Sequence, residues 1–504
     1  MKKIKTALIS VYNKDGLDVI LSKLNDLNVK FISTGGTFDY IKKLGYEVRT
    51  VESLTTYPSI LGGRVKTLHP KVFGGILARL DNETDKQHIN EYDIIPIDLV
   101  IVDLYPFEET MELTDNEGEI IEKIDIGGIS LIRAAAKNFK EVLVVPSSNL
   151  YNEFIELLEN KNGSTDISDR KYFAAEAFNV SSHYDTAIFN WINPGNIVAF
   201  KESLLESVGL RYGENPHQEG RFFGKLDDVF SQIHGKAISY NNLLDLDAAI
   251  NLINDFDETT FAVIKHNNAC GLASCDNLLD AWNKALAGDP VSAFGGVLVT
   301  NRNIDKDTAE EINKIFFEII LAPSYDDNAL DILKSKKNRI ILIHKQSEFS
   351  KVQYRSLLGG VLVQDKDVKT ENASDLNTVT KKHPTQIEIE DLLFANKLVK
   401  HTKSNTIVLA KDKQLVGSGT GQTSRVDALK QAIEKTRNFG LPIKGAVMAS
   451  DAFFPFADSV EIAGNAGITA VIQPGGSIRD KESIEYCDEH GMAMVMTGVR
   501  HFKH

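Results

Sequence analysis

A lysine and a histidine stand side by side where a predicted buried strand ends. Lys265 and His266 directly follow the apolar run 261–264, so both side chains emerge at the strand's carboxyl end. An imidazole can serve as a general base while a neighbouring ammonium stabilises an oxyanion. The pair on its own would favour a histidine satisfied by the backbone, so its meaning depends on the motifs around it.

Two segments near the N-terminus combine glycines, hydroxyls and cations. Residues 33–37 (STGGT) lie between a predicted strand and a predicted helix, where free backbone N–H groups can cradle a phosphate. Residues 62–70 (GGRVKTLHP) place Arg64 and Lys66 beside two glycines, which suits gripping a phosphate and polarising a carbonyl. The alternatives are ordinary turn chemistry for the first segment and exposed charges for the second.

Further chemical groups follow in the first 140 residues. Tyr105 ends a predicted strand and places a phenol at the sheet edge, although a core tyrosine is the commoner role. Asp125 precedes a glycine pair and a helix that carries Arg133 and Lys137 at i and i+4. Two like charges on one helix face are unfavourable unless an anion lies between them, and the other interpretation is a solvated face.

The second half contains polar, glycine-rich segments but no metal or dinucleotide signature. Glycines at 417, 419 and 421 alternate, unlike the dinucleotide-binding spacing G-x-G-x-x-G. Cys270 and Cys275 lack a second Cys/His pair at ligand spacing, so we expect no catalytic metal. Segments dense in hydrogen-bonding or aromatic side chains are 211–218, 404–405, 417–425 and 450–456.

Composition narrows the class of protein. The 504 residues carry a formal net charge of −14, which argues against binding nucleic acid or acidic lipid by bulk electrostatics. Three cysteines cannot form a disulfide framework and suit a reducing compartment. We see neither a signal-peptide core nor a membrane span, so we expect a cytoplasmic protein that contacts neither nucleic acid nor membrane.

The elements that must position the first group of motifs form a regular alternation. Apolar runs at 5–11, 29–33, 46–51, 99–102 and 142–145 alternate with helical patterns, which predicts a five-stranded parallel sheet with helices on both faces. Helices are expected from Leu17, capped by Asp15, and from Phe38. Ligands should bind at the carboxyl ends of the strands.

A break at 193–196 (NPGN) follows a helical region, so we place domains at residues 1–195 and 196–504. The polar stretch 364–382 is predicted to divide the second domain into two α/β subdomains. Its predicted buried strands are 261–265, 297–300, 340–343, 360–363, 406–410 and 470–473.

In chain order, the motifs resemble those of the bifunctional enzymes that end de novo purine synthesis, which join IMP cyclohydrolase to AICAR transformylase. The resemblance covers nearly the whole chain and rests on STGGT, GGRVKTLHP, LYPF, IDIGG, IRAAAKN, RYGENPHQ, KH, SAFGG, SDAFFPF and TGVRHF. It implies a methylglyoxal-synthase-like α/β domain followed by two metal-free, cytidine-deaminase-like α/β subdomains. It also implies AICAR and 10-formyltetrahydrofolate as substrates, IMP as product, and a homodimer whose transformylase pocket spans the subunit interface.

The resemblance also implies roles for single residues. Lys265 and His266 match the formyl-transfer pair: His266 accepts a proton as the 5-amino group of AICAR attacks the formyl carbon, and Lys265 stabilises the oxyanion. The residues implied to orient and polarise the substrate during ring closure are Lys66, Tyr105, Asp125 and Lys137. The implied substrate-binding residues are Ser10, Lys14, Ser33, Thr34, Gly35, Gly36, Thr37, Arg64 and Thr67, and, in the second domain, Arg211, Tyr212, Asn405, Arg425, Phe453 and Arg500.

Four positions depart from the family pattern: Asp103, Ile129, Ala269 and Ala457. We expect Asp103 to alter the charge of the first pocket and Ala269 to loosen the loop that holds His266. Two other hypotheses were weighed. A nucleotide-sensing protein without chemistry would not need the bases and acids retained here, and a methylglyoxal synthase alone would explain only the first domain.

Overall fold

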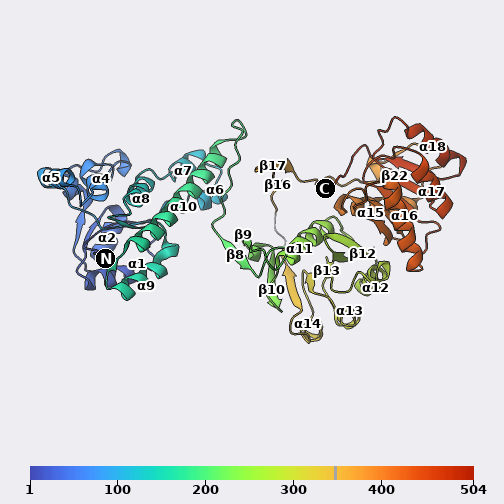
Figure 1. Cartoon of the computed structure of the whole chain (residues 1–504), viewed down its shortest axis with the longest axis horizontal. Helices are drawn as coiled ribbons and strands as arrows, with labels where there is room; N and C mark the ends of the chain where they lie inside the picture. Colours follow the sequence, from blue (N-terminus) through green and yellow to red (C-terminus); the bar gives the residue numbers. More distant parts are fainter. Residues whose placement is uncertain (346–348) are drawn as a thin grey trace. The chain divides into compact units, whose positions relative to one another are not determined.

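The computed structural model describes residues 1–345 and 349–504. These residues divide into two compact units, Met1–Leu205 and Glu206–His504 (Figure 1). The sequence break at 193–196 coincides with the end of α10 (Ile167–Ile192), the last helix of the first unit. Among the described residues, no helix is both long and apolar enough to cross a membrane.

The first unit contains the predicted five-stranded parallel sheet, in the order β4-β3-β2-β5-β6, and this prediction is confirmed. The central strands are buried on both faces because helices cover both, as is usual for a parallel sheet. A short antiparallel pair, β1 (Lys2–Lys3) with β7 (Ser164–Thr165), lies beside it. The strands of the sheet are β2 (Thr6–Ser10), β3 (Lys30–Ser33), β4 (Val48–Thr50), β5 (Leu99–Val102) and β6 (Leu143–Val145).

Helices α1 (Leu17–Asp26) and α9 (Tyr151–Lys161) lie side by side and share one apolar core with the sheet (Figure 1). A second core on the other face includes α4 (Pro70–Leu77) and α8 (Gly127–Lys137). The remaining helices of the unit are α2 (Gly35–Lys43), α3 (Val51–Thr55), α5 (Glu83–Glu91), α6 (Phe107–Leu113) and α7 (Glu117–Ile121).

Two local expectations were wrong. The N-cap of α1 is Gly16 in a left-handed conformation (φ 74°), and Asp15 does not cap the helix with its side chain. The expected loop at 34–37 is instead the start of α2, with Thr34 as N-cap and residues 35–37 in its first turn. Consequently the backbone N–H groups of this turn belong to a helix N-terminus, which strengthens their attraction for an anion.

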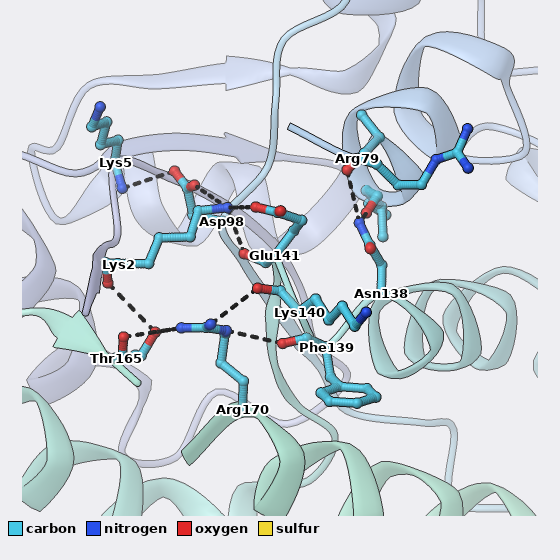
Figure 2. A network of polar contacts seen from close by, with 12 residues as sticks. Lys2, Lys5, Arg79, Asp98, Asn138, Phe139, Lys140, Glu141, Thr165 and Arg170 are labelled. Carbon is cyan, nitrogen blue, oxygen red and sulfur yellow. Dashed lines mark hydrogen bonds and ion pairs between the residues drawn. The ribbon is translucent and has the colours of Figure 1, made fainter. Parts of the chain in front are cut away.

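Arg170, near the start of α10, ties that helix to two other parts of the first unit (Figure 2). Its guanidinium donates to the carbonyl oxygens of Phe139 (2.9 Å), Lys140 (3.0 Å) and Thr165 (2.9 Å), and to the Thr165 hydroxyl (2.8 Å). The residue is 7% exposed. These hydrogen bonds hold α10 against the segment that joins α8 to β6.

The second unit is built on a twelve-stranded mixed sheet, in the order β10-β15-β14-β13-β11-β12-β20-β19-β21-β22-β23-β18. Its two halves meet where β12 pairs antiparallel with β20, at Ala273 and Gln414. The strands are β10 (Phe230–His234), β11 (Thr260–Lys265), β12 (Asn268–Ser274), β13 (Val297–Thr300), β14 (Ile319–Ala322), β15 (Ile340–His344), β18 (Asn377–Thr378), β19 (Ile407–Lys411), β20 (Gln414–Gly419), β21 (Val447–Ser450), β22 (Ala470–Gln473) and β23 (Ala493–Met496).

Two hairpins lie outside this sheet: β8 (Ser207–Leu210) with β9 (Gly220–Phe223), and β16 (Val352–Leu357) with β17 (Gly360–Asp365). The expectation of a buried strand at 360–363 was wrong, because β17 is exposed along its length. The helices of the unit are α11 (Tyr240–Ile253), α12 (Leu278–Gly288), α13 (Lys306–Ile312), α14 (Asp327–Leu333), α15 (Gln386–His401), α16 (Arg425–Asn438), α17 (Asp458–Ala466) and α18 (Asp480–Glu489).

Candidate active sites

A cavity of about 670 Å³ opens at the carboxyl ends of β2 and β3 in the first unit. Segments from five places in the sequence line it: the end of β2, the start of α2, residues 62–67, residues 103 and 105 after β5, and residues 121–128 before and at the start of α8. The sequence-predicted residues that line it are Ser10, Lys14, Thr34, Gly36, Thr37, Arg64, Lys66, Thr67, Tyr105 and Asp125.

One side of this cavity is the N-terminus of α2. The Thr34 hydroxyl is buried there and has no hydrogen-bond partner among the residues that the structure describes. Lys66 Nζ lies against the same turn, 3.0 Å from the position that a Cβ on Gly35 would occupy. An ammonium, an unpaired hydroxyl and a helix N-terminus together form a cradle for an anion.

The hydroxyl of Thr37, which also lines the cavity, is already paired within the chain. Its hydroxyl donates to the carbonyl of Val11 (2.9 Å) and accepts from the Val11 N–H (3.1 Å). It therefore fastens α2 to the end of β2, and the cradle depends on Thr34 and Lys66 for its side-chain donors.

Asp125 lines the same cavity from the segment just before α8. Its carboxylate accepts a hydrogen bond from the Gly128 N–H (2.6 Å). Burial raises the pKa of Asp125, backbone hydrogen bonds partly oppose that rise, and the negative charge of Asp103 adds to it. A carboxyl group with a raised pKa holds a proton more readily, as a general acid must.

Tyr105 is the second acidic group of the cavity. Its ring packs edge-on against Tyr12, with ring centroids 5.5 Å apart, and Lys123 Nζ lies 5.8 Å from the Tyr105 centroid. Burial, followed by the charge of Asp125, raises the pKa of Tyr105. The phenol consequently keeps its proton and can donate a hydrogen bond to a ligand.

Asp103 lines the cavity, where we expect it to alter the charge, and so do Tyr12 and Lys123, which are not among the predicted site residues. Tyr12 comes soon after β2 and Asp103 directly after β5, so the strand-end rule that singled out Tyr105 would have found them. Asp103 accepts a hydrogen bond from the Asn13 N–H (2.9 Å), and its influence on Asp125 agrees with the expected change in pocket charge.

Three sequence-predicted residues are not part of the cavity lining: Ser33, Gly35 and Lys137. Ser33 is fully buried, and its hydroxyl donates to the carbonyl of Ile9 (2.7 Å). Lys137 is exposed at the last residue of α8, whereas the first residues of that helix line the cavity. Eleven helical residues span roughly 15 Å, so Lys137 lies a helix length from the Asp125 carboxylate.

In the second unit, Lys265 and His266 lie at the turn between β11 and β12. His266 (φ 50°) and Asn267 (φ 65°) both have left-handed backbones, as a two-residue type I′ hairpin requires. Asp245 accepts the Asn267 N–H (2.7 Å), and Asn268 Nδ2 donates to the His266 carbonyl (2.7 Å). The turn presents the imidazole to solvent, and its hydrogen bonds offset the unfavourable backbone conformation.

Lys265 points away from the turn. Its Nζ donates to the carbonyls of Phe294 (3.0 Å) and Gly295 (3.1 Å), in the expected SAFGG segment. Lys265 and His266 both line a cavity of about 210 Å³, together with Asp289 and Lys435, which form an ion pair at 3.0 Å. Cys270 also lines it, but burial raises the pKa of its thiol to about 12, so it cannot serve as a thiolate.

A second group of sequence-predicted residues lies next to this turn. The Lys403 N–H donates to Asn268 Oδ1 (3.0 Å), which places the loop before Asn405 against the hairpin. Arg425 donates to Ser450 Oγ (3.0 Å) and pairs with the buried Asp451 (2.9 Å).

The C-terminal segment joins the same group. The guanidinium groups of Arg500 and Arg425 lie 4.4 Å and 6.0 Å from the ring centroid of Phe502. Phe453, from the SDAFFPF motif, is 38% exposed. The region therefore offers cations and open aromatic faces close to the His266 turn.

Arg211 and Tyr212 lie on the loop between β8 and β9, stacked on each other with 5.4 Å from guanidinium to ring centroid. Neither lines the cavity of Lys265 and His266. Across residues 1–345 and 349–504, no group of three or more His, Cys, Asp or Glu side chains is arranged to hold a metal ion.

Two family models match consecutive parts of the chain. The AICARFT/IMPCHase bienzyme family model matches residues 135–435, and the MGS-like domain model matches residues 16–130. A crystal structure of ForH aligns with 38% of this chain and 99% of its own at 32% identity, with a TM-score of 0.33.

Three full-length relatives share the name bifunctional purine biosynthesis protein PurH. The protein from Bacteroides thetaiotaomicron is 63% identical over 100% of this chain and 99% of its own length. Those from Caldicellulosiruptor saccharolyticus and Aquifex aeolicus are 48% and 47% identical, each over 99% of this chain and 100% of their own.

The fold and the matched models define an α/β protein that joins an MGS-like domain to a second α/β unit. The chain belongs to the AICARFT/IMPCHase bienzyme family. It is accordingly a bifunctional enzyme of purine biosynthesis, an AICAR formyltransferase and an IMP cyclohydrolase, which confirms the expected function and fold class.

Proposed function

We propose that ring closure takes place in the 670 Å³ cavity of the first unit and formyl transfer at the Lys265–His266 turn of the second. The observation that carries this assignment is that one cavity holds both an anion cradle and two acidic groups, Asp125 and Tyr105, whose pKa values are raised by burial. The cradle suits the phosphate of a ribotide.

Ring closure needs proton transfer and no redox chemistry. The carboxamide nitrogen of formyl-AICAR forms a bond to the formyl carbon. Water then leaves with the formyl oxygen, one carboxamide proton and the formamido proton. Asp125 can donate the proton that makes the oxygen a good leaving group, and Tyr105 can polarise the formyl oxygen by a hydrogen bond. Lys66 would hold the phosphate and add positive charge nearby.

Formyl transfer requires a base and an oxyanion stabiliser. The 5-amino group of AICAR attacks the formyl carbon of 10-formyltetrahydrofolate, the carbon–N10 bond breaks, and tetrahydrofolate leaves. The amine, conjugated to a carboxamide, is a weak nucleophile and gains from losing a proton to His266 during the attack. Lys265 Nζ would stabilise the oxygen that becomes negative, and Arg425, Asn405, Phe453 and Arg500 would bind the nucleotide.

A homodimer would account for two predicted substrate-binding residues that lie outside the formyl-transfer cavity of their own chain. Arg211 and Tyr212 do not line the cavity of Lys265 and His266, and they would reach a transformylase pocket in the partner. Lys137 lies at the end of α8 that is far from the first cavity, and we assign it no contact with the ring-closure substrate. Exposed apolar side chains on the β16–β17 hairpin would offer surface for such an assembly, including Leu358 in its turn at 100% exposure and Leu362 on β17 at 59%.

Paired variants test the assignment. We expect Asp125→Asn to lower cyclisation of supplied formyl-AICAR by roughly 10²- to 10⁴-fold while formyl transfer changes less than about twofold, because only the first cavity loses its acid. His266→Ala should do the reverse by a similar factor. Both rates are measured by absorbance and by chromatography for IMP. Equal loss of both activities in either variant would contradict two separate sites.

A further inference from the structure

Tyr184, on α10, bonds to the segment that carries the acid of the first cavity. Its hydroxyl accepts a hydrogen bond from the Asp125 N–H (2.9 Å) and donates one to the Lys123 carbonyl. Tyr184 comes 59 residues after Asp125 and is not among the described residues that line the cavity. One phenol from a helix distant in sequence therefore holds the backbone on both sides of Ile124.

The backbone that Tyr184 holds has little regular structure of its own. It connects α7 to α8, and residues 124 and 125 belong to neither a helix nor a strand. The two preceding N–H groups still bond to carbonyls of α7, both at 3.0 Å. The Asp125 N–H bonds to the phenol oxygen instead, so the position of the Asp125 backbone depends on a tertiary contact.

Packing holds the phenol in turn. Tyr184 is 7% exposed and forms a small apolar core with Phe107 and Ile120, against which Ile124 packs. The rings of Tyr184 and Phe107 lie edge to face with centroids 6.0 Å apart, and Phe107 makes a similar contact with Trp191 at 5.8 Å. Because the ring is enclosed by these contacts, its hydroxyl has a defined place from which to hold the segment.

The phenol keeps its proton near neutral pH. Burial raises the pKa of Tyr184 to about 12, and the backbone hydrogen bond from Asp125 partly opposes that rise. The hydroxyl consequently stays both a donor to the Lys123 carbonyl and an acceptor for the Asp125 N–H. A change with pH in the neutral range therefore reports on the groups of the cavity rather than on this bridge.

Two groups of the cavity depend on the bridge, because Lys123 and Asp125 both line it. The Asp125 carboxylate also accepts the Gly128 N–H (2.6 Å), so the acid is held by its backbone and by its side chain. Lys123 Nζ lies 5.3 Å from the ring centroid of Tyr12, at the mouth of the same group of aromatic rings. Removing the hydroxyl would leave an N–H and a carbonyl unpaired in a partly buried segment, which would then shift or admit water.

We propose that Tyr184 is a positioning residue for ring closure, whose hydroxyl sets the place of the Asp125 carboxyl in the first cavity without touching the substrate. This inference rests on the proposed function, in which Asp125 donates a proton to the leaving oxygen. The anion cradle is built from the start of α2 and from Lys66, away from the bridge. The hydroxyl should therefore affect proton transfer far more than binding of the ribotide.

Tyr184→Phe tests this role because it removes the hydroxyl and keeps the ring in its core. We expect kcat for cyclisation of formyl-AICAR to fall roughly ten- to a hundredfold, since a displacement of about 1 Å near the reacting atoms can cost that much. KM should change less than about twofold because the cradle is intact. The matched control, Tyr172→Phe, removes an exposed hydroxyl on the same helix that bonds to Glu153 (2.7 Å), and it should keep the wild-type kcat.

Two further measurements separate positioning from a general loss of stability. Cyclisation needs protonated Asp125, so kcat falls as pH rises through the pKa of that carboxyl. Water admitted to the loosened segment lowers that pKa, and the fall should begin at lower pH in Tyr184→Phe. Amide hydrogen exchange of residues 123–125 should quicken in this variant, while exchange in the first turn of α2 stays as in the wild type.

Defined outcomes would contradict the role. A wild-type kcat and pH profile in Tyr184→Phe would overturn it. So would a Tyr184→Phe loss that is just as large in an Asp125→Asn background, because the hydroxyl would then act on another group. A wild-type cyclisation rate in Asp125→Asn itself would overturn the proposed function, whereas exchange of residues 123–125 in Tyr184→Phe would still decide whether the hydroxyl holds the segment.

Discussion

At the scale of single residues, His501 shows how the C-terminus is held beside the second site. Its ring is 2% exposed and contacts two carboxylates, Asp367 at 2.6 Å and Glu371 at 3.2 Å. Asn396 donates a further hydrogen bond to Glu371 (2.7 Å). Arg500 and Phe502 flank His501 in sequence, so this buried contact fixes where both lie.

The contact makes stability depend on pH. Burial alone would lower the pKa of His501, but the hydrogen bonds and charges of Asp367 and Glu371 outweigh it and raise the pKa to about 9. The stabilisation is fully present below the unfolded pKa near 6.5 and is lost as pH rises through about 9.

We therefore expect the free energy of unfolding to fall between roughly pH 6.5 and 9, by on the order of 3 kcal/mol, in the wild type but not in His501→Gln. Urea unfolding at several pH values measures the slope. The exposed His383→Gln is the control and should keep the wild-type slope. An identical slope in His501→Gln would show that other groups cause it.

At the scale of elements, two helix N-termini line the first cavity. The first turn of α2 supplies the anion cradle, and the first turn of α8 holds Asp125 through the Gly128 N–H. Gly128 is needed for a steric reason: a Cβ there would lie 2.6 Å from Asp125 Oδ2. The position of the Asp125 carboxylate therefore depends on residue 128 being a glycine, which has no side chain.

Gly128→Ala should separate activity from stability. We expect cyclisation to fall at least about tenfold because the carboxylate is displaced, while the free energy of unfolding changes by less than about 1 kcal/mol, since alanine favours a helix over glycine. Cyclisation assays and urea unfolding measure the two effects. In an Asp125→Asn background, Gly128→Ala should lower the cyclisation rate little further. If the two losses of cyclisation rate were fully additive in free energy, Gly128 would act elsewhere than on Asp125.

At the scale of the whole molecule, the two activities should depend differently on assembly. The cavity that holds Asp125 is lined by one chain, whereas Arg211 and Tyr212 do not reach the cavity of their own chain's His266. If formyl transfer needs a partner, dilution below the dimer dissociation constant removes it.

We accordingly expect specific formyl-transfer activity to fall on dilution while cyclisation of supplied formyl-AICAR stays constant per chain. Light scattering or sedimentation over the same concentrations reports the oligomeric state. Activities that remain constant while dimers dissociate would exclude a pocket shared between subunits.

Local patterns in the sequence were sufficient for the framework of the first unit. Continuous apolar runs such as 99–102 mark strands buried on both faces, and helical spacing from Leu17 marks α1, because both depend on contacts that repeat every few residues. The strand-end rule then located Tyr105. Shorter or more polar strands, such as β12 with its glycine and cysteine, lack that pattern and were missed.

Tertiary structure alone decided which of the candidate side chains meet. Ser33 and Thr34 are neighbours, yet one hydroxyl bonds the adjacent strand and the other faces the cavity. Gly128 and Lys137 share a helix but lie near opposite ends of it. Sequence determined the elements and the types of chemical group at their ends. Direction and distance between elements arise from long-range packing, which no local pattern encodes, and so only the folded chain sets them.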